Sequence, residues 1–289
     1  LFVVGVSAWY LLRRREQRMA RKSIAVASAF GLVFALAAAV TGHRSGAIVA
    51  HVQPMKLAAM EALYEGQEGA SLTAVGLLQP HGRPVNGEAF RFQIGIPKLL
   101  SWMSFGDKEA YVPGIYDLID GNEQRGILSA EEKMQRGRVA IAEMPRYREA
   151  LVAGDTTTAD EVLREYFAYF GYGHIDSPQQ LIPNVPILFY SFRVMVGAGS
   201  FFILLLGVVW WLNRKDRLAD KRWLLRVAVW SIPLAYLASQ AGWIVTEIGR
   251  QPWAIQDLMP VGVAASKIPS GSVSVTFFLF LALFTALLA

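Results

Sequence analysis

The chain has 289 residues, of which 54% are hydrophobic and only 18% are charged. A water-soluble domain of this size carries about 25% charged residues, so the composition favours a membrane protein. Because the chain has no cysteine, it cannot contain disulfides, cysteine-ligated zinc, cysteine-held iron–sulfur clusters or thiol nucleophiles. The net charge of +5 is modest, and its distribution along the chain is more informative than its size.

The hydrophobic residues form five runs. A transmembrane helix needs about 20 apolar residues; the third and fourth runs reach this length, and the second reaches it if its polar neighbours are included. Basic residues follow the short first run, which is the wrong order for a signal peptide. We expect a truncated helix there, and a fragment at both ends because the last run is still apolar where it stops. The runs are Leu1–Leu12, Ile24–Val40, Ile187–Leu212, Trp223–Val245 and Val273–Ala289.

Two basic loops predict the orientation in the membrane. Arg13–Lys22 contains six lysines and arginines, and Asn213–Arg222 contains five. Alternation of spans puts both loops on one side, and the positive-inside rule makes that side cytoplasmic. The long segment 41–186 and the shorter segment 248–272 are then outside. Anionic lipid headgroups explain the basic loops, so we expect no nucleic-acid partner.

The long outer segment carries helix signals. Ser129 and Thr158 each begin a capping-box pattern, with a glutamate three residues later. The sequence therefore predicts helices over 130–153 and 159–170, with Pro145 kinking or dividing the first, Gly154 and Gly171 at the C-caps, and a loop with a strand or two over 66–106.

The predicted fold class is an all-α membrane protein, in which a transmembrane helix bundle carries a long, partly helical outer loop. We divide it into residues 1–40 (a truncated helix, a basic loop and a second helix), 41–186 (the outer loop) and 187–289 (three transmembrane helices).

Charged groups at membrane depth are costly and therefore mark functional sites. Arg193 lies about two turns inside the third run, and Glu247 ends the fourth. Arg226 is one turn from the cytoplasmic boundary, where its side chain can extend to water. On the residues alone, Arg193 and Glu247 could form an intramembrane ion pair in a non-redox transporter or receptor with an outer ligand-binding domain.

Haem and metal ligands are limited to few residue types. The four histidines, His43, His51, His81 and His174, all fall in the outer segment, and we interpret them as surface residues. Methionine can ligate haem iron, and Met195 lies two residues from Arg193. Ordinary helix packing is the alternative interpretation of Met195, and a solvated helix face is the alternative for Lys56 and Glu61.

Four motifs resemble subunit I of the cytochrome bd-type quinol oxidases, in order along the chain. The most specific is Glu247-Ile-Gly-Arg-Gln-Pro-Trp253, with Trp243 one turn before the glutamate. Phe192-Arg-Val-Met195 resembles the family's Arg-x-Met haem segment, and Val52-Gln-Pro-Met-Lys-Leu-Ala-Ala-Met-Glu61 resembles the start of its quinol-binding loop. Residues 5–12 resemble the end of a helix in that subunit.

The resemblance implies roles for these residues. Met195 is implied as an axial ligand of the low-spin haem b, with Arg193 beside that haem, and Glu247 as the axial ligand of the high-spin haem b. Trp243 is implied to assist electron transfer. Lys56 and Glu61 are implied to bind the quinol and accept its proton, with Arg250 and Gln251 as haem-propionate or quinone-site partners.

The resemblance also implies an electrogenic quinol:oxygen oxidoreductase of the bacterial inner membrane, which reduces oxygen to water and generates a proton motive force. Its third haem is haem d or another haem b. Its partners are subunit II, a small single-helix subunit, ubiquinol or menaquinol, oxygen and membrane lipid. The family's histidine ligands and proton-path glutamates precede the segment found here, so the fragment alone is not expected to reduce oxygen.

Overall fold

The computed structural model describes residues 1–80, 84–85, 87–266 and 268–288. His81 lies outside these residues. The chain forms two compact units, the first made of Leu1–Gln135 and Ile175–Pro252 and the second of Arg136–His174 and Trp253–Ala289. Among the residues described, four helices are long and apolar enough to cross a membrane; they lie in Gln17–Val52, Pro178–Arg214, Arg222–Gly249 and Ser270–Leu288. The predicted helical membrane fold is confirmed.

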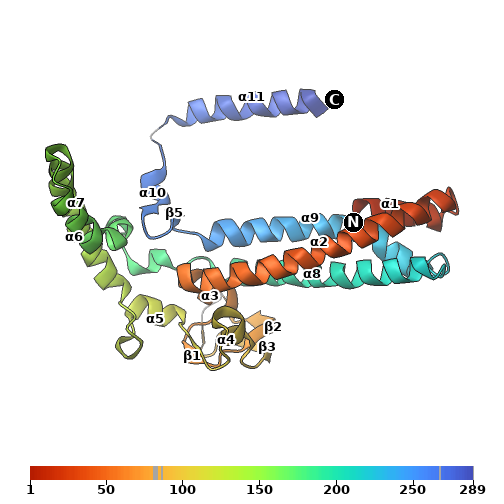
Figure 1. Ribbon diagram of the computed structural model, residues 1–289, viewed down its shortest axis with the longest axis horizontal. Coiled ribbons are helices and arrows are strands. Elements are labelled where there is room, and N and C mark those ends of the chain that lie inside the picture. The colour runs from red at the N-terminus through yellow and green to blue at the C-terminus, as the bar shows by residue number, and fades with distance from the viewer. Residues whose placement is uncertain (81–83, 86, 267, 289) are drawn as a thin grey trace. The chain divides into compact units, whose positions relative to one another are not determined.

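The first unit is built on four helices that lie side by side (Figure 1). They are α1 (Phe2–Leu12), α2 (Gln17–Val52), α8 (Val185–Arg214) and α9 (Arg222–Gly249). One apolar cluster joins all four, because each helix contributes small or branched side chains to it. At Gly5 an added Cβ would lie 2.9 Å from the Ala228 carbonyl oxygen, so α1 and α9 pack as closely as a glycine allows.

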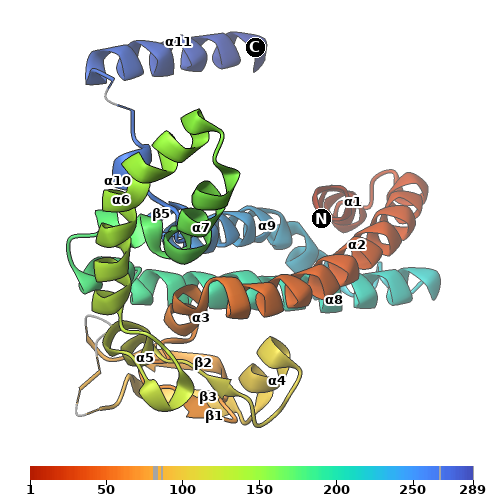
Figure 2. The same cartoon turned by 60° about the vertical axis from the view of Figure 1, so that its left-hand side comes forward.

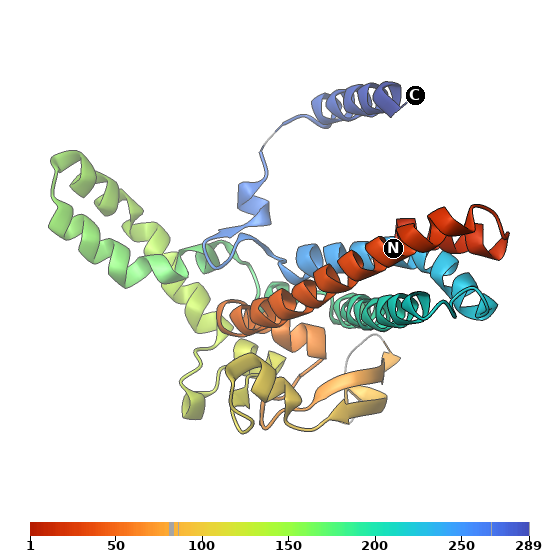
Figure 3. The same ribbon diagram turned by 45° about the vertical axis from the view of Figure 1, so that its right-hand side comes forward.

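The two basic loops lie at the same end of this bundle (Figure 3). Arg21 Nη1 is 2.5 Å from Asp216 Oδ1, and Asn213 Nδ2 donates to the Arg21 carbonyl oxygen at 3.0 Å. The two loops therefore contact each other directly.

Helix α2 is longer than its apolar run. It continues past Val40 to Val52, because the residues that follow are compatible with a helix and the next proline is Pro54. Helix α3 (Pro54–Glu61) begins at that proline. The first twelve residues of the predicted outer segment are thus an extension of the membrane helix.

Around α3 lies a small folded region of the outer segment (Figure 2). Strand β2 (Leu72–Leu78) pairs antiparallel with β3 (Phe90–Ile96), with Leu72 opposite Ile96 and Leu78 opposite Phe90. This hairpin confirms the strands expected within 66–106. The remaining elements are β1 (Gln67–Glu68), α4 (Leu99–Phe105), β4 (Tyr111–Val112), α5 (Ile115–Asp120), η2 (Glu123–Arg125) and η4 (Pro178–Leu181). Apolar side chains of β2, α4, β4 and α5 share one core with α3 and the first turns of α8.

Helices α8 and α9 exceed the hydrocarbon core of a bilayer. Their 30 and 28 residues correspond to roughly 40–45 Å at about 1.5 Å per residue, against a core of about 30 Å. If the basic ends mark one boundary, about 20 residues reach the other near Met195 on α8 and Gly242 on α9. Arg193 and Glu247 then lie near the boundary that is farther from the basic loops.

The second unit contains most of α6 (Ala130–Ala153), with α7 (Thr156–Tyr166), η3 (Phe167–His174), β5 (Trp253–Ile255), β6 (Met259–Pro260), α10 (Val261–Ala264) and α11 (Ser270–Leu288). Helix α6 has the predicted bounds, and Pro145 does not divide it. The Ser129 hydroxyl accepts from the Glu132 amide at 3.1 Å, and Gly154 follows the helix with φ +74°.

The predicted start of the second outer helix and its predicted C-cap are both wrong. Asp155 caps α7, accepting from the Thr158 amide at 3.1 Å, so the helix begins at Thr156. A carboxylate accepts more strongly than the Thr158 hydroxyl that the sequence suggested. Gly171 is no C-cap but lies inside η3, where its amide donates to the Asp257 carbonyl oxygen at 3.1 Å.

Candidate functional site

Helix α3 brings the predicted quinol residues to the ends of α8 and α9 that lie away from the basic loops. It packs against both helices, and its C-terminus turns sharply at Ala62, which has φ +51°. Lys56 and Glu61 are five residues apart, so on a helix their side chains point about 140° apart. They therefore reach different helices rather than one another.

Glu61 reaches Arg193 on α8. Arg193 Nη2 donates to Glu61 Oε2 at 2.8 Å and to the Thr73 carbonyl oxygen at 2.9 Å, and Nη1 donates to the Met60 carbonyl oxygen at 2.8 Å. The guanidinium lies over the Phe189 ring, 3.4 Å from its centroid. Both partners are sheltered, since the Glu61 side chain is 3% exposed and that of Arg193 is 13% exposed.

This environment favours the protonated form of the Glu61 carboxyl more than water does. Burial raises its pKa to about 7, while Arg193 and a hydrogen bond from the Thr73 backbone partly oppose the rise. A base acts best when its pKa lies near the working pH. The carboxyl is thus suited to taking a proton and releasing it again.

Lys56 reaches α9 at the glutamate–arginine motif. A Cβ added to Gly249 would lie 2.8 Å from Lys56 Cε, so the lysine stem lies directly on this glycine. Burial lowers the pKa of Lys56, Arg250 lowers it further and Glu247 opposes both. Arg250 Nη2 is 2.5 Å from Glu247 Oε2. Gln251 follows with an exposed side chain.

Met195 on α8 contacts α9 at Gly242, seven residues before Gly249. A Cβ added to Gly242 would lie 3.1 Å from Met195 Sδ, so the thioether lies against this glycine. The neighbouring Trp243 is 64% exposed on the helix surface. Two glycines of α9 therefore receive the two side chains that the resemblance assigns to haem and quinol.

The contacts exclude one sequence-based alternative. The ion pair between Arg193 and Glu247, proposed for a transporter or receptor, is not formed: Arg193 pairs with Glu61, and Glu247 pairs with Arg250. Sequence reasoning missed the contact between Arg193 and Glu61, because 132 residues separate them. His43, His51 and His174 are exposed, as predicted. His43 stacks on Trp102, whereas His51 and His174 make edge-to-face contacts with Phe105 and Phe170.

A family model for cytochrome bd terminal oxidase subunit I matches residues 1–289, the whole chain. The chain belongs to the cytochrome bd terminal oxidase subunit I family. This confirms the family that the motifs indicated.

Curated relatives agree. The chain is 32% identical over its full length to cytochrome bd-II ubiquinol oxidase subunit 1 of Escherichia coli, covering 56% of that protein. It is 30% identical over 94% of its length to cytochrome bd ubiquinol oxidase subunit 1 of Bacillus subtilis, covering 47% of it. The chain thus spans about half the length of these relatives.

A solved structure shows the same fold. The bd oxidase from Geobacillus thermodenitrificans matches 99% of this chain and 51% of its own, with a TM-score of 0.65 and 23% identity.

Family membership implies haem cofactors, and the side chains fit them. Met195 and Glu247 offer a thioether and a carboxylate at the outer ends of α8 and α9. Within the part of the chain that the structure describes, Arg193 Nε and Arg250 Nε are buried and have no hydrogen-bond partner. Two arginine donors without acceptors suit the carboxylate groups of haem. The described residues contain no group of three His, Cys, Asp or Glu that could bind a separate metal ion.

Proposed function

We propose that the whole protein is an oxidoreductase that oxidises quinol at its outer face and reduces oxygen to water. The single observation that supports this most strongly is the pairing of Glu61 with Arg193. It links the predicted quinol base to the Arg-x-Met segment in one buried contact. A buried carboxyl with a pKa of about 7 is the group that quinol oxidation needs to take up a proton at neutral pH.

In this proposal, different residues of the chain bind the quinol, accept its proton and orient the acceptor. Lys56, fixed on Gly249, donates a hydrogen bond to one quinol oxygen, and Glu61 accepts a proton from the substrate. Arg193 keeps the Glu61 carboxyl oriented. Trp243 assists electron transfer, and Arg250 and Gln251 contact a haem propionate or the quinone.

Met195 would bind the iron of the low-spin haem b and Glu247 that of the high-spin haem b, and Arg193 would tune the first of these haems. When bound, these haems and a haem d, or a third haem b, supply the electron transfer from quinol to oxygen.

We place the basic loops in the cytoplasm and segment 41–186 outside, in a bacterial inner membrane, on the positive-inside rule. Protons released outside and consumed from the cytoplasm then generate a proton motive force. The partners are subunit II, a small single-helix subunit, ubiquinol or menaquinol, and oxygen. We also retain the division into residues 1–40, 41–186 and 187–289.

A reduced-minus-oxidised absorption spectrum of the full-length complex tests this function. Bands of b-type haem, with or without a red-shifted haem d band, are expected, and Met195→Leu should alter those of the low-spin haem b. Glu61→Ala should slow quinol oxidation while the haem bands remain. A well-folded complex without visible bands would overturn the proposal and favour a non-redox transporter or receptor.

A further inference from the structure

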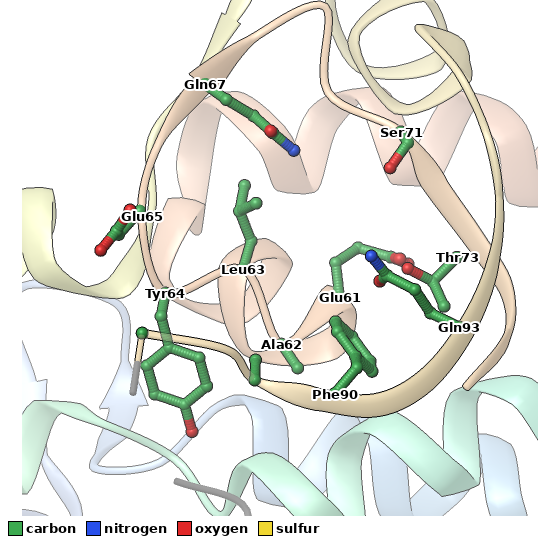
Figure 4. A pocket seen from close by; sticks show the side chains of 12 residues that line it. Glu61, Ala62, Leu63, Tyr64, Glu65, Gln67, Ser71, Thr73, Phe90 and Gln93 are labelled. Atoms are coloured by element: carbon green, nitrogen blue, oxygen red, sulfur yellow. The ribbon is translucent and has the colours of Figure 1, made fainter. Parts of the chain in front are cut away.

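A pocket of about 190 Å³ opens at the buried side chain of Glu61 (Figure 4). It lies between the C-terminal end of α3 and the β2–β3 hairpin. In Figure 4 the side chains of Thr73 and Gln93 lie next to Glu61, and those of Gln67 and Ser71 lie farther along the pocket wall. The pocket therefore begins at the buried carboxyl.

The pocket leads from the protein interior to solvent. Glu61 and Thr73 are buried, Ser71 is half-buried, and Gln67 and Gln93 are exposed. Since one water occupies about 30 Å³ in the liquid, the volume accommodates several waters. Hydroxyl and amide side chains along the wall give such waters the two to four polar partners that they need.

Glu61 also contacts Arg193, which does not line the pocket. Arg193 donates hydrogen bonds to the Glu61 carboxylate and to the backbone carbonyls of Met60 and Thr73. Arg193 is therefore the charged group that faces Glu61 from α8. Among the described residues that line the pocket, the charged ones are Glu61 and the exposed Glu65. Arg193 therefore stabilises the ionised form of Glu61 after its proton has left.

We infer that this pocket is the outlet through which a proton accepted by Glu61 leaves for the outer aqueous phase. The inference rests on the proposed function. When a quinol O–H bond breaks, the Glu61 carboxylate binds the proton, and a bound haem would supply the electron acceptor. Transfer of that proton to a pocket water regenerates the carboxylate beside Arg193. The excess proton then moves along waters held by Thr73, Ser71 and Gln93.

Blocking the outlet tests this role in the full-length complex. Ser71→Leu places an apolar side chain in the pocket, and Gln93→Leu removes an exposed amide with little change in size. The matched control is Gln124→Leu, since Gln124 is exposed in η2 and does not line the pocket. Thr73→Val keeps the shape of a buried side chain and provides a second variant that is expected to fold.

We expect the pocket variants to lower kcat for quinol oxidation about tenfold, to increase its solvent deuterium isotope effect, and to leave KM and the haem spectrum unchanged. In these variants Glu61 should stay protonated longer during turnover. The infrared band of its protonated carboxyl, assigned by its loss in Glu61→Gln, should therefore persist longer. The control should match the parent.

The outcomes separate the two proposals. If Glu61→Gln oxidises quinol at the parent rate, the proposed function of Glu61 fails. If Glu61→Gln is inactive but the pocket variants keep the parent kcat and isotope effect, the outlet is wrong and the function stands. A raised quinol KM with unchanged kcat would also overturn the outlet, because it would make the pocket part of the substrate site.

Discussion

Arg193 on α8 and Glu61 at the end of α3 form a buried ion pair, with Nη2 2.8 Å from Oε2. The arginine also donates to two backbone carbonyls, so it joins the membrane bundle to the folded outer region. Removing one partner of such a pair leaves an uncompensated charge, whereas removing both need not destabilise the protein. This asymmetry gives the contact a testable thermodynamic signature.

Arg193→Leu should destabilise the complex by about 3–5 kcal/mol, because the Glu61 carboxylate loses its cation and the carbonyl oxygens of Met60 and Thr73 lose their donor. The double variant Arg193→Leu/Glu61→Leu should recover a substantial part of this loss. Thermal or denaturant unfolding of the purified complex measures both changes. Equal destabilisation in the single and double variants would show that the uncompensated Glu61 charge does not cause the loss of stability.

The rate of quinol oxidation should depend on pH through Glu61. Only the ionised carboxylate can accept a proton, so kcat/KM should fall as the pH drops below about 7, the pKa to which burial raises Glu61. Because Arg193 lowers this pKa, Arg193→Gln should move the acidic limb to higher pH. Steady-state rates from pH 5 to 9 give the profile. If the acidic limb of the pH profile were unchanged in Arg193→Gln, the titrating group would be one other than Glu61.

Glu61 also makes stability depend on pH. Its folded-state pKa of about 7 lies above the ordinary 4.5, so the folded protein binds the extra proton between these values. The stabilising contribution is complete below pH 4.5 and is lost as the pH rises through 7. Glu61→Gln should therefore flatten the decline in melting temperature between pH 5 and 8. A decline as steep as in the parent would exclude Glu61 as its cause.

Local signals were predictable from the sequence, and long-range contacts were not. The bounds of α6 followed from Ser129 and Gly154, because capping depends on residues a few positions apart. The start of α7 was wrong because two acceptors, Asp155 and Thr158, compete within one turn. The family motifs selected Glu61 and Arg193, but nothing local in either segment indicates that they pair.

Gly249→Ala should weaken quinol binding without destabilising the fold. The new Cβ would lie 2.8 Å from Lys56 Cε and displace the lysine, while replacing a helical glycine favours the helix by up to about 1 kcal/mol. We expect KM for quinol to rise about three- to tenfold with unchanged haem bands. The matched control is Gly207→Ala on α8, where no described atom lies within 4 Å of the added Cβ. Equal KM values in the two variants would show that Lys56 does not take part in quinol binding.

The outer region depends on a second carboxylate, Asp117. Its Oδ2 accepts from the Tyr111 hydroxyl at 2.7 Å and the Gly114 amide at 2.9 Å, and its Oδ1 accepts from Asn122 Nδ2 at 2.8 Å. Burial alone would raise the pKa of Asp117, but these hydrogen bonds outweigh it and lower the pKa below 3.8. Asp117→Ala leaves three donors without an acceptor and should cost about 1–3 kcal/mol.

The pH dependence distinguishes this role from simple packing. A depressed pKa means that the contribution of Asp117 is present above pH 3.8 and is lost as the pH falls through the lower folded-state value. The difference in melting temperature between the parent and Asp117→Ala should therefore be constant from pH 5 to 7 and should shrink below pH 4. Asp120→Ala, at the exposed end of α5, is the control and should match the parent throughout. A difference that persisted unchanged at pH 3 would mean that lost packing, rather than the ionised carboxylate, destabilises the variant.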